Sequence, residues 1–274
     1  MSRTWLVVDA NNVAWRMFHV FRDLSHKQVL TGVVYGLLRD VERLTRMHAA
    51  VGVAFCFDRG GKQARRKLFA GYKLKRDMWN PDLKAARDEM HTQLKLLQED
   101  YLPSAGFTNI FSAAGFEADD VIASVVQNMA GDERAVVVSS DKDLYQLIDD
   151  RHVVWDGKRV VTEAVLKAEF GVGPKDWKYV KAIAGCSSDC VPGVKGVGET
   201  LAARYVAGEN IGVGRTAKIK EFMAEGLYDR NLHLVTLPLD GCPEFTLSYE
   251  KPDLRKYDAL VRRLGIKSMT KGGR

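Results

Sequence analysis

The chain has 274 residues, of which 46% are hydrophobic, and it carries a formal net charge of +6. This length suits one large globular domain, or a core with a small accessory domain, and no apolar run approaches the roughly 20 residues of a membrane span. The first residues, MSRTWLVVDANN, lack the pattern of a signal peptide, so we expect a cytoplasmic protein without a membrane partner.

Strands and helices are predicted to alternate through the first 170 residues. Strands are predicted at 5–8, 51–57, 108–111 and 135–138, and helices at 13–24, 32–47, about 81–101 and from about 117 onward. A small hairpin is expected within 152–161. This alternation is typical of an α/β domain whose central sheet is mostly parallel and flanked by helices.

After residue 171 the pattern changes to helical segments that are separated by glycine-rich turns. The most pronounced turn covers 192–198 and precedes a helix predicted at 199–206. An ordinary turn between two helices would account for it, and so would a backbone that approaches a phosphate closely. We place a boundary near residue 170, with an α/β core at 1–170 and a helical region at 171–274.

Acidic residues follow three of the predicted strands, and two further acidic groups begin predicted helices. The acids concerned are Asp9, Asp58, Asp141, Glu117, Asp119, Asp120 and Asp143. In a parallel sheet these side chains would converge at the carboxyl edge, where α/β proteins bind their ligands.

Such crowded carboxylates suit Mg²⁺ or Mn²⁺, and two of these ions can clamp a phosphodiester between them. The alternative is that each acid only caps a helix, which would be sufficient for any one of them. It explains the whole set poorly, because Asp58 precedes no convincing helix.

A basic segment follows Asp58 directly. Residues 59–76 include no acid and eight basic residues, which are Arg59, Lys62, Arg65, Arg66, Lys67, Lys73, Lys75 and Arg76. Basic side chains neutralise phosphates, and the interleaved Phe69 and Tyr72 could stack on unpaired bases. A solvated charged surface is the alternative. The position after Asp58 favours phosphate binding, with Lys73 and Arg76 as candidates to stabilise charge on the scissile phosphate.

Six blocks of sequence resemble a known family. They are VVDANNVAWRMFHV (7–20), TGVVYGLLR (31–39), FCFDRGGKQARRKLFAGYKLKR (55–76), GFEADDVIAS (115–124), SSDKDLYQL (139–147) and CSSDCVPGVKGVGE (186–199). In this order they are similar to the 5′ nuclease family of flap endonucleases. That family includes free-standing phage and bacterial 5′–3′ exonucleases and the N-terminal nuclease domain of bacterial DNA polymerase I.

The resemblance implies a PIN-like nuclease core and a structure-specific 5′ nuclease that hydrolyses DNA through metal-activated water. The implied metal ligands are Asp9, Asp58, Glu117, Asp119, Asp120, Asp141, Asp143 and Asp189. The implied DNA contacts are Arg65, Arg66, Tyr72, Lys73 and Arg76 in a basic arch at about 59–84, and Gly193, Lys195, Gly196 and Gly198 in a hairpin at 192–198. Lys73, Arg76 and Asp141 are the implied catalytic residues. The hairpin would belong to a helix–three-turn–helix unit and hold a K⁺ ion.

One departure from the family lies at the implied second metal site. The family usually has Gly-Asp-x-x-Asp-Asn where this chain has Gly185, Cys186, two serines, Asp189 and Cys190. A thiol is a poor ligand for Mg²⁺. We therefore expect weakened binding of the second ion, with the first site intact.

Three functions stay open at this point. The first is an active nuclease that cuts 5′ flaps, nicks or 5′ ends, as a monomer and with a replicative polymerase as a candidate partner in trans. The second is a DNA-binding protein whose nuclease site has degenerated, with Cys186 as the first sign. The third is a ribonuclease that removes RNA primers paired with DNA. If the protein is encoded by a phage, we expect it in the cytoplasm of the host cell.

Overall fold

A six-stranded sheet forms the centre of the computed structural model, which describes residues 3–75, 81–249 and 253–269. Its strands, in the spatial order β5-β4-β1-β6-β7-β8, are Ile110–Ser112, Gly52–Phe57, Arg3–Asp9, Glu133–Val138, Val153–Trp155 and Val160–Val161. All neighbours pair in parallel except β7 and β8. The predicted mostly parallel sheet is therefore confirmed.

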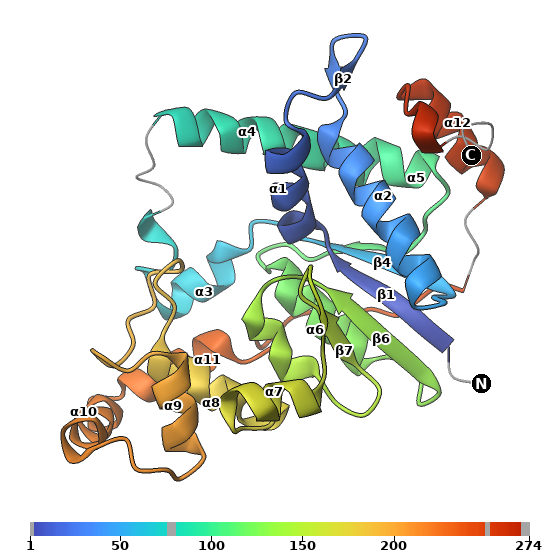
Figure 1. Cartoon of the computed structure of the whole chain (residues 1–274). Helices are drawn as coiled ribbons and strands as arrows, with labels where there is room; N and C mark the ends of the chain where they lie inside the picture. The colour runs from blue at the N-terminus through green and yellow to red at the C-terminus, as the bar shows by residue number, and fades with distance from the viewer. Residues whose placement is uncertain (1–2, 76–80, 250–252, 270–274) are drawn as a thin grey trace.

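Helices cover both faces of the sheet (Figure 1). Successive residues of a strand point to opposite faces, so Trp5 and Val7 of β1 pack on one side and Leu6 and Val8 on the other. The second side is covered by α1 (Ala10–Phe21), α2 (Gly32–Met47) and α4 (Pro81–Leu96), and the first side by α6 (Ala118–Gln127). Because both faces are buried, the strands are apolar throughout instead of alternating.

Other elements complete this core. The helix predicted at 81–101 comprises α4, a π-helical turn at Leu97–Tyr101 and the short α5 (Leu102–Ser104). A two-stranded hairpin of β2 (Ser25–His26) and β3 (Val29–Leu30) projects beyond α1, and α3 (Lys62–Leu68) lies inside the basic segment. Neither the hairpin nor α3 was predicted. The acidic segment after β6 continues as a 3₁₀ helix at Lys142–Leu147.

The second half of the chain consists mainly of helices. They are α7 (Glu163–Phe170), α8 (Pro174–Ala184), α9 (Glu199–Val206), α10 (Val213–Ala224), α11 (Leu227–Val235), α12 (Leu254–Arg263) and a 3₁₀ turn at Lys267–Met269. The helix predicted at 199–206 has the bounds of α9. None of the helices in the described residues is both long and apolar enough to serve as a membrane span.

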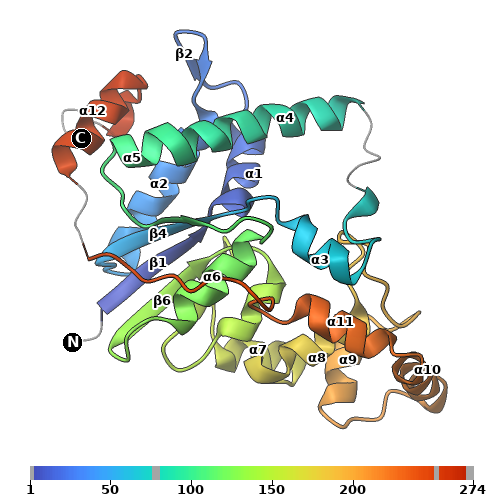
Figure 2. The same cartoon turned by 180° about the vertical axis from the view of Figure 1, so that it is seen from behind.

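The two parts of the chain share one core. Trp177 of α8 and Ile219 of α10 belong to the same buried cluster as Trp5. After α11 the chain returns across the molecule to α12 (Figure 2), and Pro243 on this return accepts a hydrogen bond from Ser124 of α6 at 2.8 Å. Helix α12 packs its Val261 into the opposite cluster with α2 and α5. The boundary proposed near residue 170 thus marks a change of element type within one hydrophobic structure.

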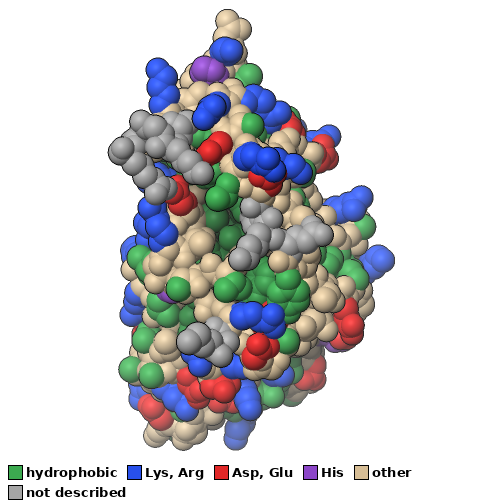
Figure 3. All heavy atoms as spheres, turned by 90° about the vertical axis from the view of Figure 1, so that its right-hand side faces the viewer, with side chains coloured by type: hydrophobic (Ala, Val, Ile, Leu, Met, Phe, Trp, Pro, Cys, Tyr) green, Lys and Arg blue, Asp and Glu red, His purple; other side chains and the backbone are tan. Residues whose placement is uncertain are grey.

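An apolar cavity of about 320 Å³ lies between α2, β4 and α12, and Phe107, Tyr257 and Met269 are among its walls. The surface view in Figure 3 shows hydrophobic side chains gathered on one face of the molecule, among scattered lysines and arginines. The cavity contains none of the predicted site residues.

Candidate active site

Five of the eight predicted acids line one cavity of about 560 Å³ at the carboxyl edge of the sheet. They are Asp9, Asp58, Glu117, Asp119 and Asp141. Asp9 ends β1, Asp58 follows β4, and Asp141 lies three residues after β6, so the parallel register places all three at the same edge. The convergence that the sequence predicts therefore occurs for these five residues.

Asp9 is fixed by two hydrogen bonds. Its Oδ1 accepts the backbone N–H of Asn12 at 2.9 Å and its Oδ2 accepts the hydroxyl of Ser139 at 2.8 Å. Asp9 is therefore the N-cap of α1 as well as a member of the cluster. Burial raises the pKa of Asp9 to about 6, because water no longer stabilises the charged form.

Three other acids of the cavity, Asp58, Asp141 and Asp119, also have raised pKa values. Asp58 is an exposed residue and accepts the N–H of Ala118 at 2.7 Å, yet partial loss of water around its carboxyl in the cavity and the charge of Glu117 raise its pKa to about 6. Asp141 is exposed as well, and partial loss of water around its carboxyl together with the neighbouring Asp143 raises its pKa to about 6. Burial also raises the pKa of Asp119 well above its ordinary value. A cation bound among these oxygens would stabilise the ionised carboxylates and lower their pKa values.

Lys73 supplies one such cation. Its Nζ forms a short ion pair with Glu117 Oε1 and lies 3.7 Å from Asp189 Oδ1. Its backbone N–H donates to the carbonyl of Asp189 at 2.7 Å, and its φ of 53° lies in the left-handed region. Burial would raise the pKa of Glu117, but Lys73 and Arg65 outweigh burial and lower it. Glu117 is thus held ionised by the protein itself.

The donor chemistry of the five-acid group fits a hard divalent ion, because carboxylate oxygens are the ligands that Mg²⁺ and Mn²⁺ prefer. Among the residues that the structure describes, no three Asp, Glu, Cys or His side chains are arranged so that they could already hold a metal ion. One physical reason for this arrangement is that Glu117 forms an ion pair with Lys73. A metal ion would therefore have to compete with this ammonium group.

Arg65 and Asp120 form a buried pair. The guanidinium of Arg65 donates to both oxygens of Asp120, at 2.6 and 2.9 Å, and to the carbonyl of Leu234 at 2.9 Å. Asp120 also accepts the N–H groups of Glu117 and Leu239. Arg65 and Asp120 are 2% and 0% exposed. Neither residue lines the acidic cavity, and the roles predicted for them, a metal ligand for Asp120 and a DNA contact for Arg65, stay predictions.

Tyr72 is also buried, and its ring packs against Val191 and Leu234. Its hydroxyl donates to Glu117 Oε2 at 2.6 Å. The predicted support of the arch agrees with this packing, and the predicted stacking on a base stays a prediction. Arg66 donates to the carbonyl of Tyr72 at 2.9 Å and keeps partial exposure. Arg76 lies outside the described residues.

The turn at 192–198 packs against the end of α8. The N–H of Val194 donates to the carbonyl of Ile183 at 2.9 Å. A Cβ at Gly193 would collide with the carbonyl oxygen of Ala184, so this glycine is required by packing. Gly196 has a φ of 83°, and like Gly198 and the side chain of Lys195 it faces solvent. The exposed positions are the ones available to a ligand.

Two features of the site were not predicted. Asn231 of α11 is fully buried, and its Nδ2 donates to the carbonyls of Ala182 at 3.0 Å and Pro192 at 2.8 Å, which fixes the turn. Arg87 and His91 of α4 line the acidic cavity from the opposite side, with Arg87 Nε 3.1 Å from His91 Nε2. Their spacing of four residues on a predicted helix was the available signal.

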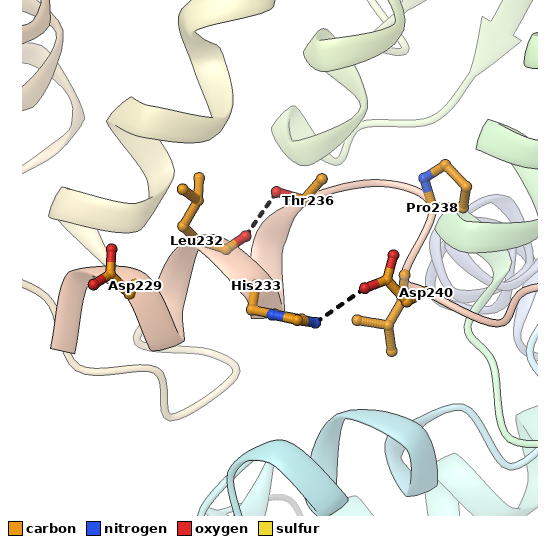
Figure 4. A pocket seen from close by; sticks show the side chains of 7 residues that line it. Asp229, Leu232, His233, Thr236, Pro238 and Asp240 are labelled. Atoms are coloured by element: carbon orange, nitrogen blue, oxygen red, sulfur yellow. Dashed lines mark hydrogen bonds and ion pairs between the residues drawn. The ribbon is translucent and has the colours of Figure 1, made fainter. Parts of the chain in front are cut away.

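A separate pocket lies beside the end of α11 (Figure 4). Its polar lining includes His233, whose Nε2 is 3.2 Å from Asp240 Oδ2, together with Asp229 and Thr236. The two paired side chains are 53% and 89% exposed, so the contact is a surface interaction of little energetic weight. No predicted site residue lines this pocket.

Comparisons with known proteins point to one family. Residues 4–171 match the family model described as 5′-3′ exonuclease, N-terminal resolvase-like domain. A 5′-3′ exonuclease of Aquifex aeolicus is 30% identical over 98% of this chain and 94% of its own length. DNA polymerase I of Mycobacterium leprae is 32% identical over 73% of this chain, and the match spans only 22% of the polymerase.

Solved structures show the same fold. The T5 5′-exonuclease with bound zinc superposes with a TM-score of 0.72 at 22% identity, covering 86% of this chain and 90% of that protein. The catalytic core of Rad2 in complex with a DNA substrate superposes with a TM-score of 0.56 at 13% identity, covering 96% and 87% of the two chains.

Proposed function

Because this chain belongs to the 5′-3′ exonuclease family, we propose that it is a metal-dependent, structure-specific 5′ nuclease that hydrolyses DNA phosphodiesters. The observation that carries this proposal is the cavity in which five carboxylates face basic residues of the arch and of α4. Lys73, Lys75 and Arg87 line it together with the acids. The basic side chains would bind a phosphate group, and metal ions held by the carboxylates would activate the water molecule that attacks it.

Asp9, Asp58, Glu117, Asp119 and Asp141 are the residues that would hold Mg²⁺ or Mn²⁺. A divalent ion bound there would lower the pKa of a water molecule and neutralise charge on the phosphate. Within the chain, Ser139 and Asn12 keep the carboxylate of Asp9 in place. Lys73 is placed to balance negative charge on a phosphate in the cavity, since its ammonium group already faces the acids.

The DNA path would continue on both sides of this cavity. An adjoining cavity of about 320 Å³ between α3 and α4 shares Asp58, Lys73 and Arg87 with the first and adds Lys62 and Lys95. On the other side, Lys195 and the exposed glycines of the 192–198 turn would contact the duplex backbone, and the turn would hold the expected K⁺ ion. Relatives of known structure in complex with DNA, such as human GEN1 with a Holliday junction, support DNA as the partner.

A panel of end-labelled substrates tests this function. In Mg²⁺ or Mn²⁺ the protein should cut a 5′-flap duplex or a nicked duplex near the junction, and an RNA–DNA hybrid tests the primer-removing alternative. DNA affinity is measured in parallel by fluorescence anisotropy. If the flap binds tightly and no product forms with either metal, the chain is a DNA-binding protein and the proposed activity is refuted. If only unpaired RNA is cut, the substrate class is refuted.

A further inference from the structure

The second pair of predicted acids, Asp143 and Asp189, does not line the five-acid cavity, and both residues lie near the thiol of Cys186. The third member of this group is Cys186, whose Sγ lies 3.0 Å from Ser188 Oγ. A free cysteine thiol is ordinarily neutral at physiological pH. The pair therefore offers two carboxylates and a neutral sulfur, a weak donor set for a hard divalent ion.

An ammonium group lies against Asp143. Lys181 of α8 is 6% exposed, and its Nζ lies 2.9 Å from Asp143 Oδ1 and 3.0 Å from Glu199 Oε1. The ammonium group of a lysine is ordinarily charged at physiological pH, and two carboxylates hold this one. Lys142 approaches the other oxygen of Glu199 at 2.7 Å. Lys181 is thus a buried, permanently charged cation between two carboxylates.

The two acidic groups differ in how far nearby basic side chains balance their negative charge. Asp143 faces the ammonium of Lys181, and Asp189 faces that of Lys73 at 3.7 Å. Each of these two carboxylates thus faces an ammonium group, with a neutral thiol as the third neighbour, and the same two lysines also pair with Glu199 and Glu117. The five-acid cavity, by contrast, has five carboxyls in its lining against three basic side chains, Lys73, Lys75 and Arg87. A divalent ion would relieve unbalanced charge in the cavity and create it at the second pair.

We propose that the ammonium group of Lys181 takes the place of a second divalent ion at Asp143, so that the DNA-free protein holds one divalent metal ion and not two. This inference rests on the proposed function, because it assumes that the five-acid cavity binds the first ion. Lys181 also connects two parts of the molecule. It joins Asp143 to Glu199, which lies in the first turn of α9 directly after the 192–198 turn, and so links the acidic edge to the proposed duplex contact.

The number of bound Mn²⁺ ions tests the proposal, measured from the electron paramagnetic resonance signal of the free ion and by isothermal titration calorimetry. The wild type and Lys181→Arg should each bind one ion tightly, with any further ion at least ~100-fold weaker. The double variant Cys186→Asp/Lys181→Met restores the acid and removes the ammonium, and it should bind two. Lys175→Met, an exposed change on the same helix, should match the wild type.

Two ions of similar affinity in the wild type, or one ion in a folded double variant, would overturn the proposal. A wild type that binds no ion would instead refute the proposed metal-dependent function, so the two failures are distinguishable. If the double variant does not fold, the ¹⁵N resonance of the Lys181 side chain in the wild type provides the test. This resonance is assigned by its absence from the spectrum of Lys181→Arg. It should stay in place when Mg²⁺ is added beyond one equivalent, and a shift that follows a second equivalent would show displacement of the ammonium.

Discussion

Replacement of Asp9 by asparagine should stabilise the metal-free protein while it removes cleavage activity. Burial raises the pKa of this carboxyl from 3.8 to about 6. An acid whose pKa is higher in the folded state destabilises the fold once it ionises, so the cost is absent below about pH 4 and complete above about pH 6. A shift of about two units corresponds to roughly 3 kcal/mol. Asparagine avoids this cost and can still serve both Asn12 and Ser139.

Thermal unfolding in EDTA measures the effect. At about pH 8 the Tm of Asp9→Asn should exceed that of the wild type by several degrees, and the gain should shrink toward about pH 5. Mg²⁺ should raise the Tm of the wild type much more than that of the variant, because the ion binds only the folded state. Asp240→Asn, at a position 89% exposed, is the matched control. Equal Tm values in EDTA at pH 8, or an equal response of both proteins to Mg²⁺, would refute this reasoning.

Three further substitutions separate structural from functional residues. Arg65→Met should lower the free energy of unfolding by about 3–5 kcal/mol in a urea titration, because a buried carboxylate loses its partner. Arg66→Met should cost far less, and equal losses would contradict the buried pair. Lys73→Ala should slow single-turnover cleavage by ~100-fold with a small change in DNA affinity, unlike Lys75→Ala. A loss of affinity as large as the loss of rate would make Lys73 an anchor only. Asn231→Ala should weaken duplex binding in anisotropy measurements more than it slows cleavage, because two carbonyls that hold the 192–198 turn lose their donor. An unchanged Kd would contradict that role.

The sheet was predictable because its strands are short apolar runs bounded by polar residues. The helix at 32–47 was predicted with the bounds of α2, since its apolar residues recur at helical spacing. The β2–β3 hairpin escaped prediction because its turn places Lys27 and Gln28 at φ values of 48° and 65°, where glycine or asparagine is the usual signal. Helix α3 escaped because its basic sequence carries no apolar stripe.

The site was predictable where a residue's role follows from its place on a strand. Asp9, Asp58 and Asp141 were identified because each follows a predicted strand, and a parallel sheet brings such residues together. The pairing of Arg65 with Asp120 joins residues 55 positions apart. Local sequence does not distinguish such a buried arginine from its exposed neighbour Arg66, and it gives Asp120 the same place at a helix start as Asp119. The role of Lys181 depends on a contact of the same long-range kind.

The most direct test of the central claim is the single-turnover rate of cleavage of a 5′-flap duplex as a function of Mg²⁺ concentration. The rate should be zero in EDTA, rise to a plateau with Mg²⁺, and fall at least ~1000-fold in Asp141→Asn, while Asp156→Asn, outside the cavity, should retain the wild-type rate. Cleavage that persists in EDTA, or an Asp141→Asn variant as fast as the wild type, would contradict the assignment of the five-acid cavity as a metal-dependent nuclease site.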